Sequence, residues 1–365
     1  MVDYTSQLKE LEDELRGTQY NKATEHHFAM VKAKMARLRE KQELSRGTGK
    51  GSAGFSVQKS GDATVVILGF PSVGKSTLLN SLTGTQSKVA AYAFTTLDCI
   101  PGVLQYKHAK IQILDVPGII RGAASGKGRG KEVLAVVRSA DLILILIDSF
   151  SPEQYGALQK ELFAANVRAN AKQPDVKIVR RSRGGIDIAS TVKLTKVSNE
   201  GLMAILREFK LQNCHVVIRD DIDLDEFIDA VENNRSYIPA ISVVSKIDLL
   251  NKEEVKELVA SIKPDVLVSA STGEGIPQLK EALFKKLGFL RVFLKEINKK
   301  PDMEEPMIVR KGATLRTICD KIHRDFTRKF KYVRIWGASA KFPGQQFKNL
   351  EKKLDDGDIV EIHTS

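Results

Sequence analysis

The sequence of 365 residues is short of cysteine and of long apolar runs, and each shortage excludes a class of protein. Its three cysteines, Cys99, Cys214 and Cys319, lie far apart and have no paired spacing. They predict neither a zinc site nor a disulfide framework, and they suit a reducing cytoplasm. No run approaches the roughly twenty apolar residues that cross a bilayer, so we expect no membrane partner. Residues 1–4 lack the basic start and the apolar core of a secretory signal peptide.

Positive charge, by contrast, is in excess. The chain has 57 Lys and Arg against 45 Asp and Glu, which gives a net charge of +12. This balance favours an anionic partner larger than a nucleotide, with nucleic acid as the leading candidate. On charge alone, a solvated basic surface without such a partner is an equally good explanation.

One stretch carries a specific motif. The apolar residues 64–68 lead into Gly69-Phe70-Pro71-Ser72-Val73-Gly74-Lys75-Ser76, and a helical pattern begins near Thr77. A strand, then G-x-x-x-x-G-K-S, then a helix is the context of a phosphate-binding loop. Its glycines let backbone N–H groups point at an anion, and the helix adds its positive N-terminal end. We expect Lys75 to reach the β- and γ-phosphates and the Ser76 hydroxyl to hold Mg²⁺. The alternative is a glycine-bearing turn that binds no ligand.

The rest of the chain divides by its periodicity. Residues 1–45 predict a helical hairpin, and 46–62 predict a glycine-rich linker. Residues 63–171 and 239–288 alternate strands and helices, which predicts a parallel sheet covered on both faces. Residues 172–238 break this rhythm and predict an inserted domain. Residues 289–365 have a β-β-α-β-β order that suits a ubiquitin-like β-grasp module.

Each flanking region has a basic surface, and the sequence leaves open what that surface binds. In the hairpin, Lys32, Lys34, Arg37, Arg39 and Lys41 are expected to face outward. Docking of the hairpin on another domain or a partner is favoured over a DNA-reading helix-turn-helix. The inserted domain has the basic run Lys177, Arg180, Arg181, Arg183, Lys193 and Lys196, which fits RNA or an ordinary solvated loop. The C-terminal module has Arg324, Arg328, Lys329, Lys331 and Arg334 beside Phe326, Phe330 and Tyr332. These aromatic residues either contact RNA or, as we favour, fill the small core.

Three more segments occur at strand ends downstream of the loop. Asp115 ends an apolar strand, where it is expected to hold a magnesium-bound water, and the Gly118 N–H is expected to approach the γ-phosphate. Asp248 offers a carboxylate for the ring N–H and the amine of guanine, and the Lys246 stem packs on the base. The Ala270 N–H, next to Ser269, is expected to donate to the guanine carbonyl. Together these segments predict GTP rather than ATP.

Between the loop and Asp115 lies Phe94-Thr95-Thr96, on a connection suited to an ordering switch. We expect Thr96 to contact Mg²⁺ and the γ-phosphate. The predicted nucleotide-binding residues are therefore Gly69, Pro71, Ser72, Val73, Gly74, Lys75, Ser76, Thr77, Asp115, Gly118, Lys246, Asp248, Ser269 and Ala270. Those for the metal are Ser76, Thr96 and Asp115, and those for catalysis are Lys75, Thr96 and Gly118. The glycine-rich residues 118–130 form the candidate switch, or else a loop that is always disordered.

The segments at 69–77, 94–97 and 115–120 resemble those of the Obg-related GTPases. Gly-Lys-Gly-Arg-Gly at 126–130 narrows the resemblance to the DRG (developmentally regulated GTP-binding protein) family. Within that family, the chain resembles an archaeal-type member. The resemblance implies an α/β fold: a Ras-like P-loop G domain with an inserted ribosomal-S5-domain-2-like α+β piece, an N-terminal helical hairpin and a C-terminal TGS β-grasp domain. It also implies a cytoplasmic GTPase that associates with the ribosome or RNA and acts in translation. Eukaryotic members of the family bind a regulatory protein partner. A monomer is expected.

Three positions depart from relatives. Ser245 stands where Asn is usual, so the brace on the phosphate loop is expected to be weaker and the affinity modest. Arg121 stands where relatives often have an acidic residue. Ile119 occupies the position at which Ras-like enzymes have a water-orienting Gln, which predicts slow hydrolysis. A potassium ion near Ser72 is a further hypothesis, although relatives that use potassium tend to carry Asn there. The alternative function is an RNA- or protein-binding scaffold whose nucleotide site hardly turns over.

Overall fold

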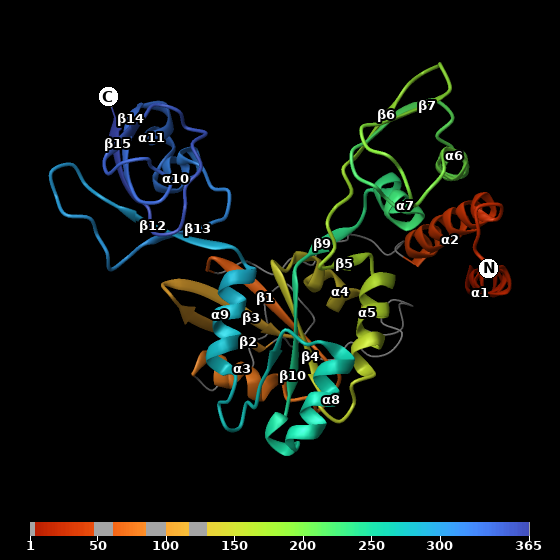
Figure 1. The fold of residues 1–365 in the computed structure, drawn as a ribbon, viewed down its shortest axis with the longest axis horizontal. Coiled ribbons are helices and arrows are strands. Elements are labelled where there is room, and N and C mark those ends of the chain that lie inside the picture. The colour runs from red at the N-terminus through yellow and green to blue at the C-terminus, as the bar shows by residue number, and fades with distance from the viewer. Residues whose placement is uncertain (1–3, 47–60, 85–99, 117–129, 365) are drawn as a thin grey trace. The chain divides into compact units, whose positions relative to one another are not determined.

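The computed structural model describes residues 4–46, 61–84, 100–116 and 130–364 (Figure 1). Predictions on Thr96, Gly118, Ile119 and Arg121 therefore lie outside the described residues. The chain divides into two compact units, Met1–Gly54 with Ala171–Tyr237 and Phe55–Asn170 with Ile238–Ser365. Among the helices within the described ranges, none has the length and apolar character needed to cross a membrane.

The second unit contains a six-stranded sheet in the order β11-β10-β4-β1-β3-β2. Its strands are β1 (Ala63–Leu68), β2 (Ile100–Tyr106), β3 (Ala109–Asp115), β4 (Leu142–Asp148), β10 (Ala240–Ser245) and β11 (Val266–Leu267). Only β2 is antiparallel to its neighbour, with which it forms the predicted hairpin. Every residue of β1 and β10 is buried, which is typical of parallel strands covered on both faces.

Five helices cover this sheet. They are α3 (Lys75–Thr83), α4 (Gly130–Ser139), α5 (Gln154–Ala164), α8 (Lys252–Ile262) and α9 (Ile276–Lys286). Leu79 of α3 and Leu283 of α9 belong to one apolar core, whereas Val136 of α4, Leu162 of α5 and Leu258 of α8 belong to the other. The predicted α/β fold with two covered faces is thus confirmed. Because parallel strands end at the same edge, β1, β3, β4, β10 and β11 bring their following loops together there.

The first unit combines the hairpin with the inserted strands and helices. Its elements are α1 (Tyr4–Gly17), α2 (Glu25–Arg46), β6 (Val176–Arg180), β7 (Ile186–Ser190), α6 (Asn199–Glu208), β8 (Cys214–Ile218) and α7 (Leu224–Glu232). The strands form a sheet in the order β6-β8-β7. Outside this unit's sheet, the short strands β5 (Val167–Ala169) and β9 (Ser236–Ile238), which were not predicted, pair with each other. Phe28 of α2 shares a core with Ile205 and Phe227, so the hairpin docks on the inserted part of the chain.

Two basic residues of the hairpin do not face outward as predicted. Lys32 Nζ lies 2.6 Å from Asp225 Oδ2, and Arg37 donates to Glu208 Oε1 at 2.7 Å. The reason is that α2 has two buried faces. One face packs Val31 on α1, and the other packs the small residues 29, 33 and 36 on the inserted helices, so neighbouring side chains reach across to their acidic partners.

The C-terminal module is a five-stranded sheet in the order β13-β12-β16-β14-β15. Its elements are β12 (Phe289–Leu294), β13 (Met307–Arg310), α10 (Leu315–Ile322), α11 (Arg324–Arg328), β14 (Phe330–Trp336), β15 (Gln345–Phe347) and β16 (Ile359–Thr364). The predicted β-β-α-β-β order was wrong in two details, because it omitted β15 and had one helix where the structure has two. His323 is extended, with φ −170°, and its ring accepts from the Asp325 N–H, so the chain restarts as the separate helix α11.

Candidate functional site

The loop after β1 turns tightly between two buried elements. A Cβ on Gly69 would meet Leu146 O at 2.8 Å and the Val73 side chain at 2.9 Å, so only glycine fits without movement. Ser72 and Gly74 both have positive φ, at 63° and 97°. The turn therefore folds back on itself immediately before α3, which begins at Lys75.

Lys75 reaches back over this loop. Its Nζ donates to the carbonyl oxygens of Gly69 at 3.1 Å and of Phe70 at 3.0 Å. Burial lowers the pKa of Lys75 below its ordinary value, and the negative charge of Asp115 opposes that shift. A half-buried ammonium group held by carbonyls is ready to receive a stronger anion.

The Ser76 hydroxyl and the Asp115 carboxylate meet at the ends of α3 and β3. Ser76 Oγ donates to Asp115 Oδ2 at 2.7 Å. Asp115 is 5% exposed, and its Oδ1 is buried without a hydrogen-bond partner among the described residues. A buried carboxylate oxygen normally has a partner, and none of the described residues supplies one to this atom. Hydroxyl and carboxylate oxygens are the ligands that Mg²⁺ prefers, and the two side chains fit that ion.

Ser245 connects the loop to the guanine-motif segment at 245–248. Its Oγ lies 2.9 Å from Val73 O and 3.1 Å from Ile147 O. The hydroxyl has one proton and serves only one of these oxygens at a time, whereas an Asn amide has two. Ser245 therefore contacts the phosphate loop, but with one donor proton instead of the two that an Asn amide has.

Asp248 is exposed at the start of the short 3-10 helix Ile247–Leu249. Ser271 Oγ donates to its Oδ2 at 3.3 Å. Hydrogen bonds, first from Ser269 and then from nearby groups, lower the pKa of Asp248 below its ordinary value. The side chain therefore stays a carboxylate at neutral pH, which has only acceptors to offer.

The loop around Ala270 is tied to helix α3. Ser81 Oγ donates to Ala270 O at 2.8 Å, and buried Ser269 makes a 2.9 Å contact with Ser271. Ser81 was not predicted to have a role. The contact of Ser81 arises from the three-dimensional packing of α3, and no short sequence motif indicates it.

Of the predicted site residues, the structure places residues 69–77, Asp115, Lys246, Asp248 and Ser269–Ala270 at the ends of β1, β3, β10 and β11 or in the segments that follow these strands. Thr96 and Gly118 lie outside the described residues. One residue of this edge was missed: Asp148, at the end of β4, lies 2.7 Å from Lys246 Nζ.

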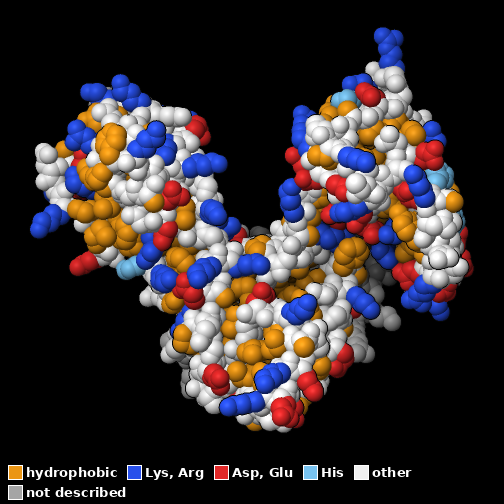
Figure 2. Space-filling view, in the orientation of Figure 1, with side chains coloured by type: hydrophobic (Ala, Val, Ile, Leu, Met, Phe, Trp, Pro, Cys, Tyr) orange, Lys and Arg blue, Asp and Glu red, His pale blue; other side chains and the backbone are white. Residues whose placement is uncertain are grey.

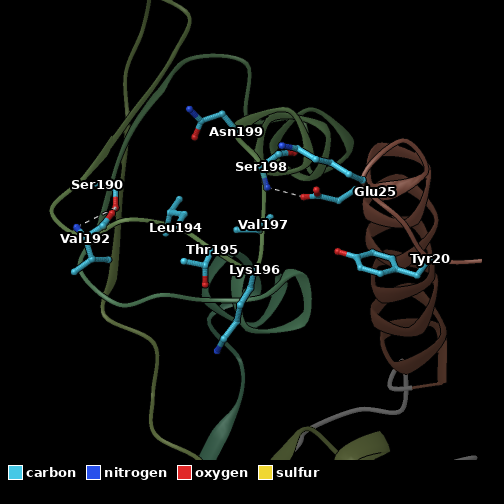
Figure 3. Close-up of a pocket in the computed structure, with 11 residues that line it drawn as sticks. Tyr20, Glu25, Ser190, Val192, Leu194, Thr195, Lys196, Val197, Ser198 and Asn199 are labelled. Carbon is cyan, nitrogen blue, oxygen red and sulfur yellow. Dashed lines mark hydrogen bonds between the residues drawn. The ribbon is translucent and has the colours of Figure 1, made fainter.

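A separate hollow of about 810 Å³ lies in the first unit (Figure 3). Buried Glu25 of α2 accepts from the Ser198 N–H at 2.6 Å, where α6 begins. Tyr20 stacks edge-on against Phe28, with ring centres 5.1 Å apart. Burial, followed by the charge of Glu25, raises the pKa of the Tyr20 hydroxyl. Of these contacts, the Glu25–Ser198 hydrogen bond joins the hairpin to the start of α6.

Three family models match successive parts of the chain. Residues 64–181 match the 50S ribosome-binding GTPase family, 183–289 match the C-terminal region of that domain, and 290–364 match the TGS domain. A GTP-binding protein of Methanocaldococcus jannaschii is 51% identical over 360 residues, which cover 98% of this chain and 92% of the relative. Developmentally regulated GTP-binding protein 2 of Homo sapiens and its homologue in Dictyostelium discoideum are 42% and 44% identical. Both alignments cover 97% of this chain and 98% of the relative.

Proposed function

Because this chain belongs to the family of developmentally regulated GTP-binding proteins, and is therefore a GTP-binding protein, we propose that it binds GTP and Mg²⁺ at the sheet edge described above and hydrolyses GTP slowly. We propose further that nucleotide state controls its association with the ribosome or RNA in the cytoplasm, with a regulatory protein as a further partner. The observation that supports the site best is the pair of Ser76 and Asp115, with one buried carboxylate oxygen that accepts no hydrogen bond from the described residues.

The roles of the described residues follow from their charges. Lys75 neutralises phosphate charge, and its contacts with the Gly69 and Phe70 carbonyls are exchanged for contacts with phosphate oxygens. Ser76 and Asp115 would hold Mg²⁺, which when bound neutralises the charge that develops on the phosphates. Lys246 and Asp248 bind the base, on its face and on its edge. Thr96 and Gly118 complete the proposal on the basis of sequence alone.

Hydrolysis is expected to be slow because Ile119 cannot orient a water molecule by a hydrogen bond. We expect single-turnover GTP hydrolysis on the order of 10⁻³ s⁻¹ or below, as for Ras-like proteins without an activator. Chelation of Mg²⁺ should abolish it, and ribosomes should accelerate it. The measurement is release of phosphate from bound GTP, with and without ribosomes and with and without a chelator.

Two outcomes would change the proposal. Turnover that stays undetectable with ribosomes present would favour the alternative, a scaffold whose nucleotide site is structural. Equal rates in potassium and sodium buffers would remove the potassium ion that we propose near Ser72, a residue whose backbone has φ 63°.

RNA contact is proposed for the C-terminal module because of its charge. Residues 289–365 carry seventeen Lys and Arg against eleven Asp and Glu, so half of the net charge of +12 lies in this module. Residues 172–238 carry eleven of each kind and are neutral overall. Lys and Arg side chains are numerous on the module's surface in Figure 2. Electrostatic attraction therefore favours the module over the inserted domain.

Three of the module's aromatic rings are engaged with protein groups, whereas Phe342 is 59% exposed. Phe330 packs against the module's core, Tyr332 stacks on His363 at 4.2 Å, and Lys295 Nζ lies 4.8 Å from the centre of the Trp336 ring. Rings engaged in this way are poor platforms for bases, so we propose that RNA is bound through its phosphates. Such binding depends little on sequence and strongly on salt.

Removing two charges from the module should weaken RNA binding. Arg328 and Lys331 are exposed, and we expect Arg328→Ala with Lys331→Ala to lower affinity for single-stranded RNA and to reduce the slope of log K against log salt by about one to two. The measurement is a titration of labelled RNA at several salt concentrations. Lys177→Ala with Arg180→Ala removes the same charge from the inserted domain and should leave the affinity within about twofold. Binding that is unchanged between low and high salt would contradict the proposal.

A further inference from the structure

A carboxylate at the end of β4 contacts the lysine of the guanine-motif segment. Asp148 Oδ2 lies 2.7 Å from Lys246 Nζ, and the two side chains are 16% and 35% exposed. Asp148 Oδ1 accepts from the Phe150 N–H at 3.0 Å. One oxygen of the carboxylate is therefore fixed by the backbone of its own turn, and the other is aimed at the lysine.

The sheet topology explains why these residues meet. β4 and β10 are parallel neighbours, and Asp148 stands opposite Ser245 in the register. The next residue, Lys246, has φ 61°, a left-handed conformation that turns the chain out of the strand. Buried Ser149, the residue after Asp148, donates to Lys246 O at 3.4 Å. The lysine is thus held at both its backbone and its ammonium group.

This contact has a consequence for a ligand that packs on the lysine stem. A long side chain in solution samples many rotamers, and a ligand that needs one of them must fix it on binding. The ion pair with Asp148 places the ammonium group in advance, so the methylene stem already lies in one direction. The pair is partly buried, and water and salt therefore screen it less than they screen a surface pair.

We propose that Asp148 is a positioning residue for the nucleotide, which holds Lys246 so that its stem packs against the face of the base. This inference rests on the proposed function, because it concerns the same nucleotide site. The stem contacts a face that all purines share, whereas Asp248 contacts the edge at which guanine differs from hypoxanthine. Asp148 therefore raises affinity for purine nucleotides without selecting among them.

Asp148→Asn tests this role, because it keeps the shape and the acceptor for the Phe150 N–H but removes the charge. We expect Kd for GDP and for IDP to rise by the same factor, about fivefold to tenfold, with no further rise when the change is made in a Lys246→Met background. Calorimetric titration of the two single variants, the double variant and the wild type measures this. Glu257→Gln, which removes an exposed carboxylate from α8, is the matched control and should leave both constants unchanged.

Three results would overturn the inference. They are a GDP Kd of Asp148→Asn within twofold of wild type, an equal loss in the Lys246→Met background, and a changed ratio of GDP to IDP affinity. Asp148→Glu keeps the charge but displaces it by one methylene, and we expect it to lose nucleotide affinity only when Lys246 is present. This variant replaces Asp148→Asn in the test if the Asn variant unfolds. A wild-type chain that binds no GDP would instead refute the proposed function itself.

Discussion

Replacing Lys75 by alanine is expected to lower the rate of GTP hydrolysis by about 10²–10³-fold and to weaken GTP binding with it. The side chain is the one cation that the described part of the phosphate loop, residues 69–77, supplies to the phosphates. Its ammonium group already lies over the loop, 3.0 Å from Phe70 O, so little rearrangement is needed when phosphate oxygens arrive. Single-turnover hydrolysis and GDP titration of Lys75→Ala against the wild type measure the two losses.

The pKa of Lys75 adds a dependence on pH with a definite sign. Burial lowers it below the ordinary value of 10.5, so the free protein loses this charge at a lower pH than an exposed lysine does. In folding, the depressed pKa opposes stability at neutral pH, and this cost is relieved as pH rises from the folded pKa to the unfolded value near 10.5. In binding, phosphates favour the ammonium form, so GDP affinity should fall as pH rises through that same folded value, before 10.5 is reached.

A control separates this effect from a general loss of positive charge. Lys286 is exposed on α9, and Lys286→Met removes a charge of the same sign from the second unit. Its hydrolysis rate and its alkaline profile should match those of the wild type. If Lys75→Ala also kept the wild-type rate, the phosphate loop would not be the site of hydrolysis.

The architecture of the sheet was predictable because its signal is local. Residues 142–147 are apolar throughout, and such a run is typical of a strand buried on both faces. The predicted motifs follow such runs, so their placement at one edge comes from the rule that parallel strands share an edge. The nucleotide-binding roles of those residues stay a prediction.

Other features depend on contacts that no local pattern records. No role was predicted for Asp148, because its link to Lys246 arises only from the order β10-β4 in the sheet. β15 has only three residues, Gln345–Phe347, and forms by pairing with β14. Lys32 was expected in solvent because helical periodicity predicts one buried face, whereas α2 is buried on two. In each case the decisive partner is distant in sequence.

Replacing Asp248 by asparagine is expected to change which base the site prefers. In the proposed site the carboxylate accepts from both the ring N–H and the exocyclic amine of guanine, whereas an Asn side chain has one acceptor and one donor group. Against guanine, the Asn donor would face the amine donor and one pair would be lost. Xanthine has a carbonyl in place of that amine, so it accepts from Asn while its ring N–H still donates.

The magnitude follows from the environment of Asp248. A buried site that hydrogen-bonds a polar group of its ligand binds analogues without that group about 10⁴-fold or more weakly. Asp248 is exposed, so water replaces part of a lost hydrogen bond there. We therefore expect Asp248→Asn to weaken GDP binding by about 10²-fold and to strengthen XDP binding by about as much. Competition titrations with GDP, XDP and ADP measure both changes. Glu274→Gln removes an exposed carboxylate from the loop after Ala270 and should leave the order of preference unchanged.

The outcome also distinguishes Asp248 from its neighbours at the same edge. A change that weakened all nucleotides equally would indicate damage to the turn at 246–248 and not loss of base recognition. That result is expected for Asp148→Asn, which acts on the lysine stem at the face of the base. If ADP or ATP bound the wild-type chain as tightly as GDP or GTP, the carboxylate would not read the base edge, and the assignment of guanine would be wrong. If only Asp248→Asn reversed the preference, two different side chains would contact the base: Asp248 at its edge and Lys246 at its face.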